Sequence, residues 1–193
     1  MLSALVVAVF VTLAWAGGPT DTIKAAIEEV IRILENPALK SRAKEAERRA
    51  AIRRAIDPVF DFAEAAKRAL GVHWRRRSAS ERKEFVKLFE DLLERAYISR
   101  IEQYEGERIV YLGESVDNSY ATVRTKIITK RGSEVPVDYW MLRQGNRWVI
   151  YDVSVEGVSL IANYHSQFNA TIAESSYEEL VKRIKAKLAQ PGE

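Results

Sequence analysis

Few side chains in this sequence are suited to catalysis or metal binding. The chain has two histidines, His73 and His165, and no cysteine. Neither histidine belongs to a metal-ligand spacing such as H-x-x-x-H, and no glycine-rich phosphate loop occurs. We therefore expect structural or surface roles for both histidines, no metal site and no cofactor.

Three aspartates are the remaining candidates for acid or base chemistry. Asp57 and Asp61 are four residues apart, but Pro58 lies between them, and helix capping is a simpler role for Asp57. Asp152 is an acid inside an apolar strand pattern, where it needs a hydrogen-bond partner. We interpret Asp152 as bonded to a neighbouring loop or helix end.

The charge of the chain is unevenly distributed. The net charge is only +3, yet residues 40–83 hold fourteen Lys and Arg against six Asp and Glu. This basic segment could attract lipid headgroups, acidic proteins or nucleic acid, or it could be a solvated helical face. Nucleic-acid binding would also need exposed aromatic residues among the arginines, and only Trp74 beside residues 75–77 fits that description.

The N-terminal residues resemble an export signal. Residues 2–13 form an uncharged apolar run, and Ala14-Trp15-Ala16 is an A-x-A cleavage pattern, although no Lys or Arg precedes the run. The run is shorter than the roughly 20 residues of a membrane span. We predict a signal peptide over residues 1–16, a single α+β domain over residues 17–193, and a periplasmic location in a Gram-negative bacterium. An uncleaved anchor or a buried N-terminal helix are the alternatives.

The hydrophobic periodicity changes from helical to twofold after Gly106, and this change predicts an α+β fold. Asp21 or Thr22 can cap a first helix that ends at Asn36-Pro37. Further helices are expected over about 40–56, 60–70 and 79–99, strands over about 108–116, 120–130, 134–143 and 147–155, and two helices at the C-terminus. We expect a curved antiparallel sheet of about four strands, packed against helices gathered on one face.

The segment 145–168 is expected to hold the last strand and the next helix together. Glu156-Gly157 breaks the strand, Gly157 permits a direct turn into the helix, and Ser159 can cap that helix. The strand over 147–155 is apolar on both faces, so its inward side is not assigned. What lies between this strand and the helix is apolar.

Several motifs in this order resemble the MlaC family, also called the toluene-tolerance family of ABC-transporter auxiliary components. They are FDF (60–62), ALG with Trp74 (69–74), E-R-x-x-F-x-x-L-F-x-x-L-L-x-x-x-Y (81–97), Y-x-G (104–106), A-x-V-x-T (121–125) and W-V-I-Y-D-V-x-V-E-G-V-S-L-x-x-N-Y-x-S-Q-F (148–168). The resemblance covers about residues 23–188. His165 departs from it, since many members are expected to have Arg there.

The resemblance implies a cone-shaped fold like that of nuclear-transport-factor proteins, with an apolar cavity for phospholipid tails. It implies a periplasmic phospholipid carrier and not an enzyme, acting as a monomer that binds no nucleic acid. Its partners would be an outer-membrane lipoprotein–porin complex and an inner-membrane ABC transporter complex with an MCE protein.

Physical chemistry supports a carrier independently of the resemblance. At about 0.8 kcal/mol per methylene, a chain of about sixteen carbons needs about 12 kcal/mol of shelter from water, which an enclosed cavity can supply. We predict that the cavity is lined from the apolar positions Phe62, Leu70, Trp74, Phe85, Phe89, Leu92, Leu93, Val123, Val137, Tyr139, Met141, Ile150, Val153, Val158, Leu160, Tyr164 and Phe168.

Two other classes of function stay open at this point. A small isomerase or dehydratase would need an acid–base pair at the pocket floor, for which only Asp152 with His165 or a tyrosine is available. An interaction module without a ligand would have an interior filled by its own side chains.

Overall fold

A computed structural model describes residues 17–190, so the predicted signal peptide lies outside the described residues. The helices are α1 (Pro19–Glu35), α2 (Glu45–Ile56), α3 (Phe62–Leu70), α4 (Ala79–Glu102), α5 (Leu160–Glu174) and α6 (Tyr177–Ala189), and the strands are β1 (Arg108–Asp117), β2 (Tyr120–Ile128), β3 (Glu134–Gln144), β4 (Arg147–Val155) and β5 (Val158–Ser159). Short 3₁₀ turns occupy Pro37–Leu39, Arg42–Lys44 and Gly71–Arg76. Within the described range, no helix combines the length and hydropathy of a bilayer span.

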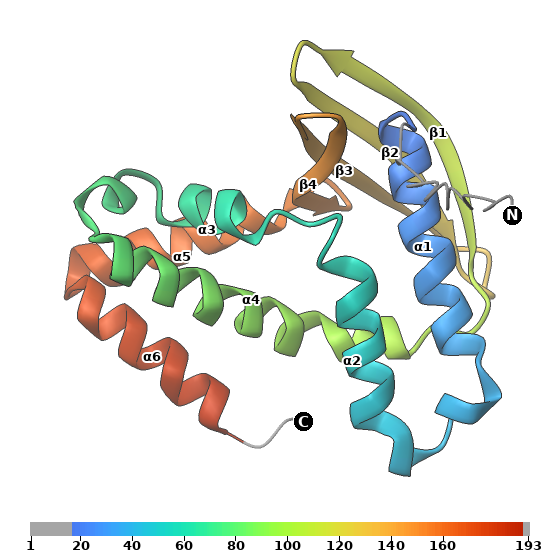
Figure 1. The fold of residues 1–193 in the computed structure, drawn as a ribbon, viewed down its shortest axis with the longest axis horizontal. Coiled ribbons are helices and arrows are strands. Elements are labelled where there is room, and N and C mark those ends of the chain that lie inside the picture. The colour runs from blue at the N-terminus through green and yellow to red at the C-terminus, as the bar shows by residue number, and fades with distance from the viewer. Residues whose placement is uncertain (1–16, 191–193) are drawn as a thin grey trace, which may run out of the picture.

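The strands form one antiparallel sheet in the order β1-β2-β3-β4-β5, which confirms the predicted α+β class (Figure 1). The fifth strand corrects the expected corner. Glu156 and Gly157 have φ angles of 51° and 81°, and they turn the chain back so that Val155 pairs with Val158 before α5 begins. A tight hairpin thus stands where a direct strand-to-helix turn was predicted.

A bulge explains why the inward side of β4 could not be assigned from its sequence. Met141 pairs with Ile150, whereas Trp140 pairs with Asp152, so Tyr151 is an extra residue in β4. Residues on the two sides of a bulge no longer alternate in phase. Buried apolar residues therefore follow one another along β4, as at residues 149–151, instead of alternating with exposed ones.

Helix α1 lies along one face of the sheet and is fixed to it at its first turn (Figure 1). The Thr20 amide and hydroxyl both donate to Glu114 Oε2 on β1, at 2.8 and 2.6 Å. The predicted cap at Asp21 or Thr22 is wrong, because Gly18 caps the helix and Pro19 occupies its first position. Behind this turn an apolar cluster of α1 and the sheet, the sheet cluster, contains the buried residues Ile23, Val59, Ala121, Val123, Met141 and Ile150, with Ala26, Ile27, Phe60, Tyr111, Tyr139, Trp148 and Val153 packed against them.

Helices α3, α4, α5 and α6 pack a second core beside the sheet (Figure 1). The Phe89 ring meets those of Tyr164 and Phe168 edge to face at 5.2 and 5.7 Å between centroids, a favourable geometry for aromatic pairs. The Ser78 side chain caps α4 by accepting from the Glu81 amide, and the Ser176 side chain caps α6 by accepting from the Glu179 amide. We call this core the helical cluster.

Helix α2 bridges the two parts of the fold. It begins at Glu45 and not near Lys40, since 3₁₀ turns occupy the residues before it. Ile52 is fully buried with Ile33 of α1 and Ile98 of α4 in a third, small apolar cluster. Arg48 and Arg49 pair with Glu102 of α4 at 2.6 and 2.8 Å, and Arg53 pairs with Glu90, Asp91 and Glu94 of the same helix.

Asp152 is bonded as the sequence predicted. Its carboxylate accepts from the Ser159 hydroxyl at 2.5 Å and from the Ile161 amide at 3.1 Å, and the Ser159 hydroxyl in turn accepts from the Ala162 amide at 2.9 Å. Asp152 is buried. If its carboxylate were removed, the Ser159 hydroxyl and the Ile161 amide would lose their acceptor, and water would not replace it. The carboxylate therefore joins β4 to the first turn of α5.

We predict that Asp152→Ala destabilises the protein by about 2 kcal/mol, the cost of leaving buried donors unpaired. Thermal unfolding should show a melting temperature about 5 °C lower. The control is Asp117→Ala, because Asp117 is exposed at the end of β1 and its carboxylate, among the described residues, accepts a hydrogen bond only from the Asn118 side chain. Equal melting temperatures for the two variants would contradict the structural role of Asp152.

A second prediction concerns alkaline pH. Burial raises the pKa of Tyr139, Tyr164 and Tyr177 to about 12. In the unfolded chain these phenols ionise near 10, so the folded protein holds more protons between about pH 10 and 12, and stability must fall as pH rises through that window. Ultraviolet titration should show some of the eight tyrosines ionising only near pH 12. A single transition near pH 10 in the folded protein would contradict the burial of these hydroxyls.

Candidate functional site

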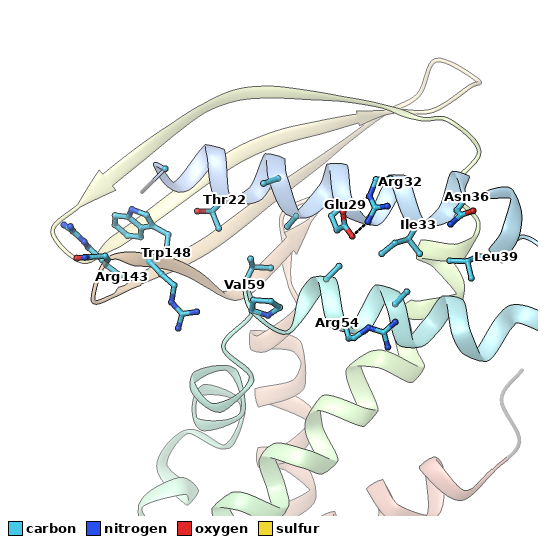
Figure 2. A pocket seen from close by; sticks show the side chains of 18 residues that line it. Thr22, Glu29, Arg32, Ile33, Asn36, Leu39, Arg54, Val59, Arg143 and Trp148 are labelled. Carbon is cyan, nitrogen blue, oxygen red and sulfur yellow. Dashed lines mark hydrogen bonds and ion pairs between the residues drawn. The ribbon is translucent and has the colours of Figure 1, made fainter. Parts of the chain in front are cut away.

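A pocket of about 950 Å³ lies between α1 and α2 and extends to the hairpin that joins β3 and β4 (Figure 2). Arg143 and Trp148 stand at its hairpin end, and Arg32, Asn36 and Leu39 stand at the other. The wall consists of Gly17, Thr22, Ala25, Ala26, Glu29, Arg32, Ile33, Asn36, Leu39, Ala51, Arg54, Ala55, Pro58, Val59, Arg143, Asn146, Arg147 and Trp148.

Small side chains leave this space open. Ala25 and Ala26 come from α1, and Ala51 and Ala55 come from α2. Alanine is an excellent helix former, but it projects only a methyl group from the helix. Two helices lined in this way remain regular without filling the gap between them.

The apolar wall of the pocket is continuous with two of the cores. Val59 belongs to the sheet cluster, and Trp148 packs against it. Ile33 belongs to the cluster shared by α1, α2 and α4, and Leu39 packs against that cluster. The pocket therefore lies along the boundary between two apolar clusters.

Arginines dominate the charge of the pocket. Arg32 forms a two-pronged bond with Glu29, which lowers the pKa of that carboxyl and raises the pKa of the guanidinium. Glu29 is the one acidic side chain in the wall. Arg54, Arg143 and Arg147 have exposed side chains, and within residues 17–190 no carboxylate pairs with any of them.

The apolar residues predicted to line a cavity do not belong to this wall. Phe62, Leu70, Trp74, Phe85, Phe89, Leu92, Leu93, Tyr164 and Phe168 lie in or against the helical cluster, and Val123, Tyr139, Met141, Ile150 and Val153 lie in or against the sheet cluster. Val137 is buried, Leu160 is half-buried, and Val158 in β5 is 59% exposed. That any of them contacts a ligand stays a prediction.

None of the residues selected by hydrophobic patterning lies in the wall of this pocket, because the wall is made largely of other residue types. Large apolar side chains pack against each other and fill the cores, whereas the pocket is formed by alanines and bounded by arginines. The four alanines that leave room between α1 and α2 were the available signal. The alanines indicate a pocket only once it is known that α1 and α2 lie beside each other.

The polar residues considered for catalysis make structural contacts. His73 bonds Asn169 at 2.9 Å, and His165 bonds the Ala69 carbonyl oxygen at 3.2 Å. Asp61 accepts from the Glu64 amide at 2.9 Å and caps α3, so the capping role assigned to Asp57 belongs to Asp61. In the described part of the chain no three acidic or histidine side chains gather in a possible metal site.

We predict that Ala55→Leu leaves the free energy of unfolding within about 0.5 kcal/mol of the parent, since its side chain would extend into the pocket. Ala66→Leu, the same change at a fully buried position of the helical cluster, should cost about 1 to 3 kcal/mol through overpacking. Denaturant unfolding measures both. A comparable loss in both variants would show that the space beside Ala55 is not available.

Comparison with known proteins is consistent with this fold. The chain is 25% identical over 148 residues to the intermembrane phospholipid transport system binding protein MlaC of Haemophilus influenzae, which covers 74% of this chain and 69% of that protein. A solved phospholipid-binding protein from Ralstonia solanacearum, in complex with a phospholipid, superposes with a TM-score of 0.80 at 23% identity, covering 90% of this chain and 100% of that one. The model of the MlaC protein family matches residues 24–186. The chain belongs to the MlaC family.

Proposed function

We propose that this protein is a phospholipid carrier that shelters acyl chains in the pocket between α1 and α2. The observation that carries the proposal is a pocket of about 950 Å³ with a partly apolar wall, in a chain of the MlaC family. The proposal is supported by the similarity to an intermembrane phospholipid transport system binding protein and to a solved structure in complex with a phospholipid.

The dimensions and chemistry of the pocket suit this cargo. Sites for small organic ligands commonly enclose about 300–1,000 Å³, and this pocket is at the large end of that range. Sheltering about sixteen carbons yields about 12 kcal/mol without any directional bond. The alanine, isoleucine, leucine and valine side chains of the wall would supply such shelter and accept tails of differing length.

The residues predicted from sequence retain a role in this proposal. The predicted residues of the sheet cluster, among them Val123, Met141 and Ile150, pack in the same cluster as Val59 and Trp148 of the wall. We propose that the inner end of an acyl chain approaches these residues. The predicted residues of the helical cluster would instead hold α2 and the β4–α5 corner in place.

The wider setting is also part of the proposal. The carrier would be exported through residues 1–16 and act in the periplasm as a monomer. It would exchange lipid with an outer-membrane lipoprotein–porin complex and with an inner-membrane ABC transporter complex that carries an MCE protein. The direction of transfer would be set by the energised transporter.

Native mass spectrometry of the protein purified from a Gram-negative periplasm tests lipid binding directly. We expect co-purified phospholipid, and reloading from phospholipid vesicles after delipidation. Ala55→Trp should reduce loading at least about tenfold, because its indole would occupy space that the tails need.

The matched control is Ala50→Trp, which adds the same side chain to an exposed position of α2 outside the pocket. It should load like the parent. A parent protein that carries no lipid and takes up none would contradict the carrier function. Equal loading by the two tryptophan variants would contradict only the location of the tails.

A further inference from the structure

The turn between α3 and α4 carries an exposed aliphatic side chain beside unpaired arginines. This 3₁₀ turn, Gly71–Arg76, lies at the end of the molecule where α5 passes into α6 (Figure 1). Val72 is 72% exposed, the largest exposure of any large apolar side chain among the described residues. Arg75 and Arg76 are exposed as well, and within residues 17–190 no carboxylate pairs with either of them.

The period of the 3₁₀ turn decides which of its side chains face outward. Residues three apart eclipse each other in this helix, so Val72 and Arg75 form one row, and Trp74 and Arg77 form another. The second row faces the protein, because Trp74 packs against the helical cluster and the Arg77 guanidinium lies 4.3 Å from the centre of the Tyr177 ring. Val72 and Arg75 therefore face solvent together.

Contacts with α5 hold the turn in this orientation. Gly71 begins the turn with a φ of 54°, and a Cβ at this position would meet the ring of His165. His73, the residue after Val72, bonds Asn169 at 2.9 Å. The fold thus keeps an aliphatic side chain in water at a fixed place, although its burial would be favourable.

The charge around the turn is positive. Residues 71–85 hold five Lys and Arg against two Asp and Glu. Both acids are already paired, Glu81 with Arg77 and Glu84 with Lys185. The acids of this segment therefore do not balance the positive charge of the turn.

We propose that this turn docks the protein on an anionic phospholipid surface, with Val72 entering the headgroup region and Arg75 and Arg76 meeting lipid phosphates. Apolar side chains and basic residues combine in this way in segments that lie on membranes. The inference goes beyond the proposed function, because none of residues 71–77 belongs to the pocket wall. Docking through the turn would hold the carrier at a membrane by residues that the cargo does not use.

A lipid surface suits the turn better than a folded acidic partner does. A specific protein interface buries about 800 Å² on each partner around a packed apolar core. One valine and two arginines do not supply such a core. A charged bilayer needs no shaped partner, because each basic residue near it adds about 1 kcal/mol, a factor of about five in affinity.

Co-sedimentation with vesicles tests the docking surface. The protein is mixed with vesicles of phosphatidylcholine alone, or of phosphatidylcholine with an equal amount of phosphatidylglycerol, and the bound fraction is measured against lipid concentration. We expect the parent to bind the anionic vesicles at least about tenfold more tightly, and to lose this preference at high salt. Arg75→Gln/Arg76→Gln should weaken binding to the anionic vesicles about twentyfold, the effect of two basic residues.

Val72→Ser separates the apolar contribution from the charge. It should weaken binding to the anionic vesicles about fivefold, because it removes apolar area from the contact. The dependence of affinity on salt should be that of the parent, since no charge changes. Binding equal to that of the parent would overturn the insertion of Val72.

The matched control is Arg42→Gln/Arg131→Gln, which removes the same charge from exposed arginines before α2 and in the β2–β3 hairpin. It should bind like the parent, and all variants should keep the parent's melting temperature. Equal losses in the two arginine variants would show that net charge alone drives binding, and would overturn the site. A parent that binds both kinds of vesicle equally would overturn the lipid surface and leave an acidic protein as the partner of the turn.

Discussion

The pocket lies between α1 and α2, which are each anchored to a different part of the fold and meet in one small apolar cluster. Glu114 and the buried Ile23 hold α1 against the sheet, whereas ion pairs from Arg48, Arg49 and Arg53 hold α2 against α4. The two helices meet where Ile33 of α1 and Ile52 of α2 are buried together with Ile98 of α4. Beside this contact the wall is formed in part by alanines, which leave space between the helices.

The corner between β4 and α5 contributes indirectly to the position of α2. Asp152 fixes the start of α5 to β4, and α5 belongs to the helical cluster against which α4 packs. Since α4 carries the acids that hold α2, the position of α2 depends on the helical cluster. The sheet and the helical cluster thus define the two walls of the pocket separately.

Much of the fold could be predicted from local patterns. The twofold alternation of β2 and β3, the cap of Ser159 on α5 and the partner of the buried Asp152 each depend on residues close in sequence or on a simple rule of burial. The start of α1 at Pro19, the extra residue Tyr151 and the short strand after Gly157 could not be derived in this way. They depend on pairing with segments far along the chain, such as the contact of Thr20 with Glu114.

The candidate site shows a sharper limit of sequence reasoning. A search for apolar side chains finds residues such as Phe85 and Phe89, which fill the interior, while a pocket is made where side chains are small. Ala25 and Ala55 carry no pattern that separates them from ordinary helix-forming alanines. Their significance appears only when α1 and α2 are placed face to face.

Photo-crosslinking with a phospholipid that carries a diazirine within an acyl chain tests most directly where the tails lie. After loading and irradiation, peptides that bear the lipid are identified by mass spectrometry. Crosslinks concentrated in residues 22–33 and 51–59 are the predicted result, because these segments face the pocket. Crosslinks confined to residues 85–93 and 164–168 would contradict the account and place the tails inside the helical cluster.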